Sequence, residues 1–126
     1  MALALWSIAV RVANMRVTIY HNQKCGTSRS VVEIVRAAGI EPQIVEYLKT
    51  PLSLAHLTQL AQQLGNAADL LRRKEPLVVQ LGLQEATDEA ILAAIAQHPI
   101  LLNRPVVVTD KGTKICRPAE LVQDLL

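Results

Sequence analysis

The sequence predicts an α/β fold: a four-stranded mixed sheet flanked by helices, with a helical insert between the two halves of the sheet. Two observations carry this prediction. Segments of strand length alternate with segments whose apolar residues recur at helical spacing, and their order along the chain is β-α-β, then helices, then β-β-α. With 126 residues, 51% of them hydrophobic, the chain can build one domain around a core and is too short to divide comfortably into two.

The first half of the predicted sheet is a β-α-β unit. Residues 16–20 alternate and are rich in β-branched side chains, which indicates a strand. After a polar loop, apolar residues recur at helical spacing at Val31, Ile34, Val35 and Ala38, which predicts a helix. Gly39 is expected to end it. Residues 43–47 form the second expected strand, and a helix between two strands favours parallel pairing.

A run of helices follows this unit and forms the predicted insert. Ser53 is a natural N-cap for a helix that ends at Gly65. Residues 66–81 indicate shorter helical pieces. Thr87 caps a further helix, and Pro99 lies just beyond the end of that helix.

The last third of the chain returns to strand periodicity. Residues 106–109, a turn at 110–112 and residues 113–116 predict a β-hairpin, after which residues 119–126 resume helical spacing. This order of elements is thioredoxin-like, with the helical insert between its halves. We place the single domain at residues 15–126.

Residues 1–14 are predicted to be an N-terminal extension outside the fold. Residues 1–13 are apolar apart from Arg11, and Met15 directly precedes the first predicted strand. A weak export signal is the alternative, although such a signal carries its positive charge before the apolar stretch. The stretch is also shorter than the roughly 20 apolar residues of a membrane span, so no membrane partner is expected.

Charge and composition argue against several classes of protein. The formal net charge is +2 and no basic run is longer than residues 72–74, so nucleic-acid binding gains no support. The aromatic residues Trp6, Tyr20 and Tyr47 are too few for a platform that stacks single-stranded bases. Two cysteines cannot form a disulfide scaffold, which favours a reducing, cytoplasmic location.

The loop at residues 20–29 carries the chemistry. It leaves a strand and enters a helix, so Cys25 is expected near the first turn, where unpaired N–H groups and the helix dipole stabilise a thiolate. Cysteine pKa values at such positions fall from about 8.5 to roughly 3.5–7.5. Lys24 and Arg29 add positive charge, and His21 could add more if protonated.

The same turn has the features of an anion cradle. Thr27 and Ser28 supply hydroxyl donors, and Gly26 allows a ligand to approach the backbone closely. The plainer alternative is that Cys25 is a small loop hydrophobe and that Thr27 or Ser28 only caps the helix; a nucleophile and a cradle in one turn favour the functional interpretation. Because Ser28 stands three residues after Cys25, the loop is not a C-x-x-C pair, and any second sulfur must come from elsewhere.

Further segments extend this loop into a resemblance that covers about Val17 to Leu126. The chain resembles the glutathione- and glutaredoxin-coupled arsenate reductase family, which is thioredoxin-like. The matching segments are Ile19–Asn22, Cys25–Arg29, Gly39–Pro42, Tyr47–Leu48, Leu70–Arg72, His98–Pro105 and Cys116–Pro118.

The resemblance implies that Cys25 attacks arsenate, that glutathione displaces an oxygen ligand from the adduct, and that glutaredoxin then reduces it so that arsenite leaves. His21 and Ser28 would help to keep Cys25 ionised. Arg104, Arg117 and Arg72 match the oxyanion-binding arginines, with Arg73 as the alternative to Arg72, and forked guanidinium groups suit oxyanions.

The resemblance also implies that the Arg104–Pro105 bond is cis and faces the nucleophile. It implies the partners arsenate, glutathione and glutaredoxin, with glutathione as co-substrate and no tightly bound cofactor. Metal binding is not expected, because no Cys or His partners occur at metal-ligand spacing.

Two other functions stay open. One is a general glutathione-dependent thiol oxidoreductase that binds its mixed disulfide at Cys25. The other is a regulator that binds RNA polymerase, like the related Spx proteins, although Ser28 removes the C-x-x-C switch common among them. Of the remaining residues, Cys116 is expected to be a packed, non-catalytic thiol, and His56 to be exposed.

Overall fold

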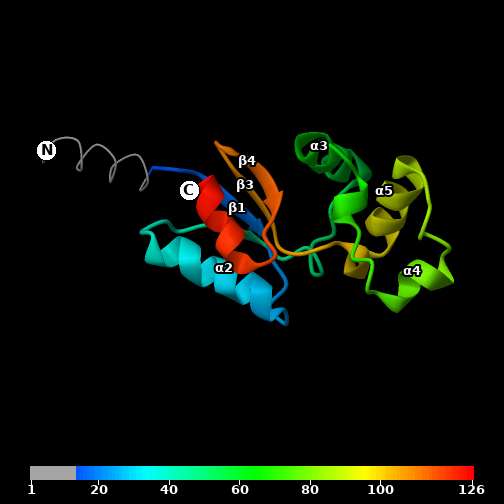
Figure 1. Ribbon diagram of the computed structural model, residues 1–126, viewed down its shortest axis with the longest axis horizontal. Helices are drawn as coiled ribbons and strands as arrows, with labels where there is room; N and C mark the ends of the chain where they lie inside the picture. Colours follow the sequence, from blue (N-terminus) through cyan, green and yellow to red (C-terminus); the bar gives the residue numbers. More distant parts are fainter. Residues whose placement is uncertain (1–13) are drawn as a thin grey trace, which may run out of the picture.

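The computed structural model describes residues 14–126. Its centre is a four-stranded mixed sheet with the spatial order β2-β1-β3-β4 (Figure 1). The predicted extension at residues 1–14 lies outside the described residues, apart from Asn14. No helix within residues 14–126 has both the length and the apolar character that a membrane span needs.

The strands pair as the order of elements predicts. β1 (Val17–Tyr20) runs parallel to β2 (Gln43–Val45) and antiparallel to β3 (Val106–Thr109). β3 pairs antiparallel with β4 (Gly112–Ile115) in a two-residue hairpin. The predicted mixed sheet is therefore confirmed. β2 is shorter than expected, and the last strand begins at Gly112 and ends before Cys116.

One face of the sheet is covered by helix α2 (Gly26–Ala37) and by the C-terminal 3-10 helix η3 (Ala119–Leu125), which pack against each other. Alternate side chains of β1 and β3 point into this layer, because successive residues of a strand face opposite sides. The buried cluster here includes Val17, Ile19, Val31, Val35, Val107, Cys116 and Val122. The last segment was expected to be helical and is, but its bonds are of the tighter 3-10 type.

The insert covers the other face and extends beyond the sheet (Figure 1). It consists of α3 (Leu54–Leu64), η1 (Ala68–Leu70), α4 (Pro76–Gln80), α5 (Asp88–Gln97) and η2 (Pro99–Leu101). The second core cluster joins these helices to the sheet through Tyr20 and Val106. Leu71 also forms an isolated antiparallel bridge with Leu102, which ties the two ends of the insert together.

The predicted caps of the insert are confirmed. Ser53 Oγ accepts a hydrogen bond from the N–H of His56, and Thr87 Oγ1 accepts one from the N–H of Ala90. Gly65 ends α3 with φ +94°, a left-handed conformation that glycine adopts without steric cost. Local chemistry therefore sets the start of both α3 and α5 and the end of α3.

Candidate active site

Cys25 is the N-cap residue of α2, with φ −94° and ψ 119°. The loop before it is organised by Asn22, whose carbonyl oxygen accepts from the N–H of Cys25 at 3.0 Å and whose Oδ1 accepts from the N–H of Lys24 at 2.9 Å. Cys25 is 9% exposed, so its sulfur is largely shielded from solvent. The described structure confirms the placement of this thiol at a helix start.

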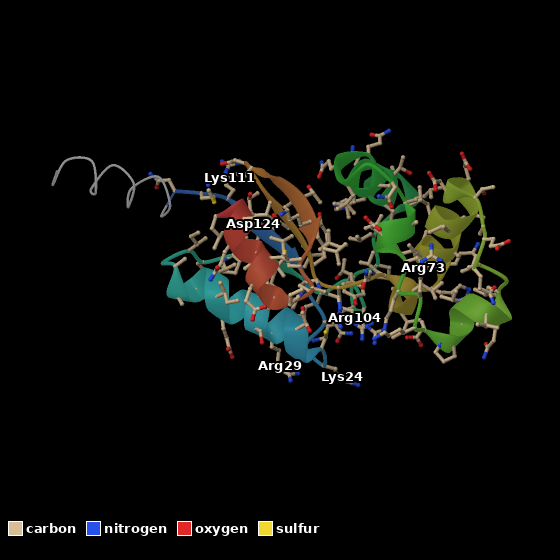
Figure 2. All side chains as sticks on the ribbon, viewed as in Figure 1. Lys24, Arg29, Arg73, Arg104, Lys111 and Asp124 are labelled. Atoms are coloured by element: carbon tan, nitrogen blue, oxygen red, sulfur yellow. The ribbon has the colours of Figure 1, made fainter. Side chains whose placement is uncertain are left out.

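The first turn of α2 follows Cys25 directly, and the backbone amide of Ser28 acts on the sulfur. Gly26 is exposed and Thr27 is half-buried, and both belong to the first turn of α2, whose first N–H groups have no acceptor inside the helix. Lys24 and Arg29 are exposed, and the Nη1 group of Arg29 donates to the carbonyl of Gln23 at 2.7 Å. Figure 2 shows Lys24 and Arg29 together at this end of α2. Arg29 therefore holds the loop by a hydrogen bond as well as contributing charge.

His21 and Ser28 form a buried pair near Cys25. Ser28 is fully buried, its Oγ lies 2.5 Å from His21 Nδ1, and it accepts from the N–H of Asn22 at 3.2 Å. Burial lowers the pKa of His21, with opposing and supporting contributions from nearby charges, so the ring is neutral at pH 7. A neutral ring that carries its proton on Nε2 accepts the Ser28 O–H at Nδ1. The Ser28 hydroxyl thus fixes the loop, and its backbone amide is the part that acts on the sulfur.

Two arginines from the far end of the chain meet Cys25. The Nη1 group of Arg117 lies 3.5 Å from Cys25 Sγ and donates to the carbonyl of Arg104 at 3.0 Å. The predicted cis bond between Arg104 and Pro105 is confirmed, and the Arg117–Pro118 bond is also cis. Both arginines flank the β3–β4 hairpin, and Figure 2 shows Arg104 near the start of α2.

The pKa of Cys25 reflects a balance of opposing effects. Burial alone raises the pKa, because it disfavours the thiolate. The backbone amide of Ser28 and the guanidinium groups of Arg104 and Arg117 outweigh burial and lower the pKa to about 7. The thiol therefore ionises more readily than an ordinary cysteine, and the thiolate is the reactive form.

Arg72 and Arg73 occupy different environments. Arg72 is half-buried, its Nε lies 3.7 Å from a carboxylate oxygen of Glu75, and it lines a cavity of about 290 Å³ together with Arg117. Arg73 also borders this cavity but is exposed, and its Nη1 donates to the carbonyl of Gln84 at 3.3 Å. Figure 2 shows Arg73 beside the insert helices and apart from Arg104. This geometry favours Arg72 as the third oxyanion-binding arginine.

The thiol of Cys116 is far less suited than that of Cys25 to act as a nucleophile. Its side chain is fully buried in the core under η3, and burial raises its pKa to about 11. The expected packing is therefore confirmed.

The expectation that His56 is exposed is wrong: the ring is half-buried, and its Nε2 lies 2.6 Å from Tyr20 Oη. Within residues 14–126, no three His, Cys, Asp or Glu side chains gather in a way that could hold a metal ion.

Two residues of the site were missed in the sequence. Asn22 shapes the turn before Cys25, and an asparagine after a strand is a recognisable turn signal. Tyr47 follows β2 and is 1% exposed, with a hydroxyl close enough to Arg104, Asn22 and Cys25 for them to influence its pKa. Nothing in the local pattern near Tyr47 indicates this position, because it depends on how the sheet and the insert come together.

Comparison with known proteins gives consistent matches. The model of the ArsC family matches residues 20–125. A protein of Escherichia coli named arsenate reductase is 48% identical over 113 residues, which cover 87% of this chain and 80% of the relative. An arsenate reductase of Rhizobium meliloti (strain 1021) is 48% identical over 115 residues, covering 89% and 82% of the two chains.

The fold has solved counterparts as well. The structure titled arsenate reductase from Vibrio cholerae superposes with a TM-score of 0.82 at 40% sequence identity. The superposition covers 89% of this chain and 98% of that one.

Proposed function

The chain belongs to the ArsC family of arsenate reductases, and we propose that it reduces arsenate to arsenite through a covalent bond between Cys25 and arsenic, with glutathione and glutaredoxin supplying the electrons. The observation that carries this proposal is the contact between Arg117 and Cys25. A thiolate with a pKa of about 7 stands 3.5 Å from a guanidinium that can also bind a tetrahedral oxyanion.

In the first step, the Cys25 thiolate attacks arsenic, a sulfur–arsenic bond forms, and one arsenate oxygen leaves as water after it is protonated. Arg104 and Arg117 neutralise the negative charge that otherwise repels the thiolate from its anionic substrate. Arg72 borders the same cavity as Arg117, which supports a role for Arg72 in binding a further oxygen. The guanidinium groups of Arg72, Arg104 and Arg117 can together donate hydrogen bonds to several oxygens of one arsenate ion.

In the next steps, the thiol of glutathione replaces a second oxygen on arsenic, which leaves as water. The thiolate of glutaredoxin then attacks the glutathione sulfur. The bond between the glutathione sulfur and arsenic breaks, and its electron pair reduces arsenic from the +5 to the +3 state. A mixed disulfide of glutaredoxin and glutathione is released. Water finally hydrolyses the remaining bond to Cys25, which frees arsenite and restores the thiol.

The need for an external thiol follows from the positions of the cysteines. The chain has two cysteines, and both are free thiols. Cys116 is fully buried in the core and has a raised pKa, so it cannot approach Cys25 without disruption of the layer formed by α2 and η3. A second sulfur must therefore come from another molecule, which supports glutathione as co-substrate.

A coupled assay tests the proposal. Purified protein is mixed with arsenate, glutathione, glutaredoxin, glutathione reductase and NADPH, and NADPH oxidation is followed. We expect oxidation that depends on arsenate and that disappears in Cys25→Ser while persisting in Cys116→Ser. No turnover of arsenate, together with turnover of a glutathionylated peptide, would replace this proposal with that of a general glutathione-dependent oxidoreductase.

A further inference from the structure

The phenol of Tyr47 is a buried polar group that the reaction above does not use. Tyr47 lies just after β2, is 1% exposed, and packs beside Leu57 and Leu102. No group among residues 14–126 makes a hydrogen bond of acceptable geometry to its hydroxyl, although the side-chain amide of Asn22 lies close enough to lower the pKa of the phenol. A buried hydroxyl without a partner destabilises a protein by about 1–3 kcal/mol, so such a group is uncommon unless something outside the protein pairs with it.

Arg104 shows the same property. Its Nε and Nη1 atoms are buried and also lack a hydrogen-bond partner within the described part of the chain. The charge of Arg104 acts on the pKa of both Cys25 and Tyr47, and Cys25 itself acts on the pKa of Tyr47. The three groups therefore lie within electrostatic range of one another. The unpaired groups within this range of the sulfur are two guanidinium N–H donors and one phenol.

The other tyrosine of the domain provides a contrast. Tyr20 is 5% exposed, but its hydroxyl is paired with His56 at 2.6 Å. A buried tyrosine in this fold can thus find a partner within the protein, and Tyr47 does not. The difference points to a ligand at Tyr47 and not to a general property of the core.

We propose that the Tyr47 hydroxyl donates a hydrogen bond to the oxyanion that Arg104 binds beside Cys25, which makes Tyr47 a substrate-binding residue. This inference rests on the proposed function, because it takes the oxyanion to be arsenate. An oxyanion carries enough lone pairs to accept from all three unpaired groups at once. Burial raises the pKa of Tyr47, with smaller opposing contributions from Arg104 and Asn22, so the hydroxyl keeps its proton at neutral pH and can donate.

This role differs measurably from a structural one. In the free protein the hydroxyl has no partner among the described residues, so Tyr47→Phe removes no bond and should not lower stability. In the complex, the same substitution removes a hydrogen bond to a charged ligand. Tyr20→Phe is the matched control, since it removes a paired hydroxyl and leaves the anion site intact.

The experiment measures arsenate binding by calorimetry in a Cys25→Ser parent, which cannot form the covalent adduct, and urea unfolding of each protein. Adding Tyr47→Phe should weaken arsenate binding about tenfold or more without lowering stability. Adding Tyr20→Phe should lower stability and leave arsenate affinity within about twofold. For a second measurement, wild-type and Tyr20→Phe proteins are labelled with ¹³C-tyrosine, and the ring signal that is missing from Tyr20→Phe is assigned to Tyr20. Addition of arsenate should shift the other ring signal, which belongs to Tyr47.

Three results would overturn the inference. Equal arsenate affinity with and without the Tyr47 hydroxyl would remove Tyr47 from the substrate site and leave the proposed function standing. A loss of stability in Tyr47→Phe would mean that the hydroxyl has a partner in the free protein. If the Cys25→Ser parent itself bound no arsenate, both the role of Tyr47 and arsenate as substrate would be rejected.

Discussion

Arg117 and Cys25 are 92 positions apart in the sequence, yet the Nη1 group of Arg117 lies 3.5 Å from the Cys25 sulfur. The contact exists because β3 pairs with β1, which leads into the Cys25 loop, and because β4 returns the chain to the same edge of the site. The contact between Cys25 and Arg117 thus depends on the pairing of β1, β3 and β4. The reactivity of the thiol is consequently a property of the folded domain and not of the loop alone.

The first prediction concerns the pH dependence of thiol reactivity. In a Cys116→Ala background, the rate of Cys25 alkylation by iodoacetamide should rise through a midpoint near pH 7 and level off above it, since only the thiolate reacts. In urea the midpoint should move up to about 8.5, the value of an unperturbed cysteine. A midpoint near 8.5 in the folded protein would contradict the site described here.

The second prediction compares two arginines. Arg117→Ala should raise the pKa of Cys25, because it removes a cation that favours the thiolate, and should lower kcat/KM for arsenate about 100-fold or more. Arg73→Ala, which removes an equal charge from an exposed side chain, should change kcat/KM by less than about threefold. Steady-state kinetics and pH-dependent alkylation measure the two effects. Equal losses in both variants would favour a general electrostatic role over contact with the sulfur.

The third prediction uses two serines of α2. Ser28→Ala leaves the buried Asn22 amide and His21 ring without a partner, and should lower the free energy of unfolding by about 1–3 kcal/mol. Ser30→Ala makes the same chemical change at an exposed position of the same helix and should stay within about 0.5 kcal/mol of wild type. Urea unfolding at pH 7.5 measures both. Two equally small effects would show that the hydroxyl of Ser28 does not hold the loop.

The fourth prediction follows from the lowered pKa of His21. Because burial lowers this pKa below its unfolded value of 6.5, the unfolded chain binds a proton more readily than the folded one. His21 therefore contributes stability that is present above pH 6.5 and is lost as the pH falls through its folded pKa. Urea unfolding at pH 7.5 and 5.5 should show a smaller loss in His21→Gln than in wild type. An identical loss in both proteins would assign the acid sensitivity to other groups.

The fifth prediction concerns the second cysteine. Cys116→Ala should lower the free energy of unfolding by about 1 kcal/mol, because it leaves a small void in a fully buried position. Arsenate turnover below the unfolding temperature should be unchanged, since Cys116 does not take part in the proposed reaction. Loss of turnover in a protein that remains folded would give this thiol a catalytic role.

Local patterns predicted the order of the elements and the caps at Ser53 and Thr87, because periodicity and capping depend on neighbours in sequence. The same holds for the position of Cys25 at the start of α2. The 3-10 character of η3 was not predicted, since apolar residues three apart suit both kinds of helix.

Contacts between residues that are distant in the sequence could not be predicted from local patterns. The arginines proposed to bind the oxyanion, Arg104 among them, came from the family resemblance, since no local rule connects an arginine beside the hairpin to a distant cysteine. The paired hydroxyl of Tyr20 and the unpaired one of Tyr47 could not be distinguished in the sequence. Both tyrosines end short β-branched segments, and their difference depends on which side chains the insert places against the sheet.

The hairpin that connects Arg104 to Arg117 has its turn at residues 110–111, at the opposite end of β3 and β4 from the site. The two arginines lie just beyond the last strand pair, Val106 with Ile115, so their separation depends on that pairing and not on the length of the hairpin. Figure 2 shows Lys111 far from Arg104. The turn can therefore be lengthened to carry a fluorophore or an affinity tag, which makes this small domain a convenient scaffold for an arsenic biosensor.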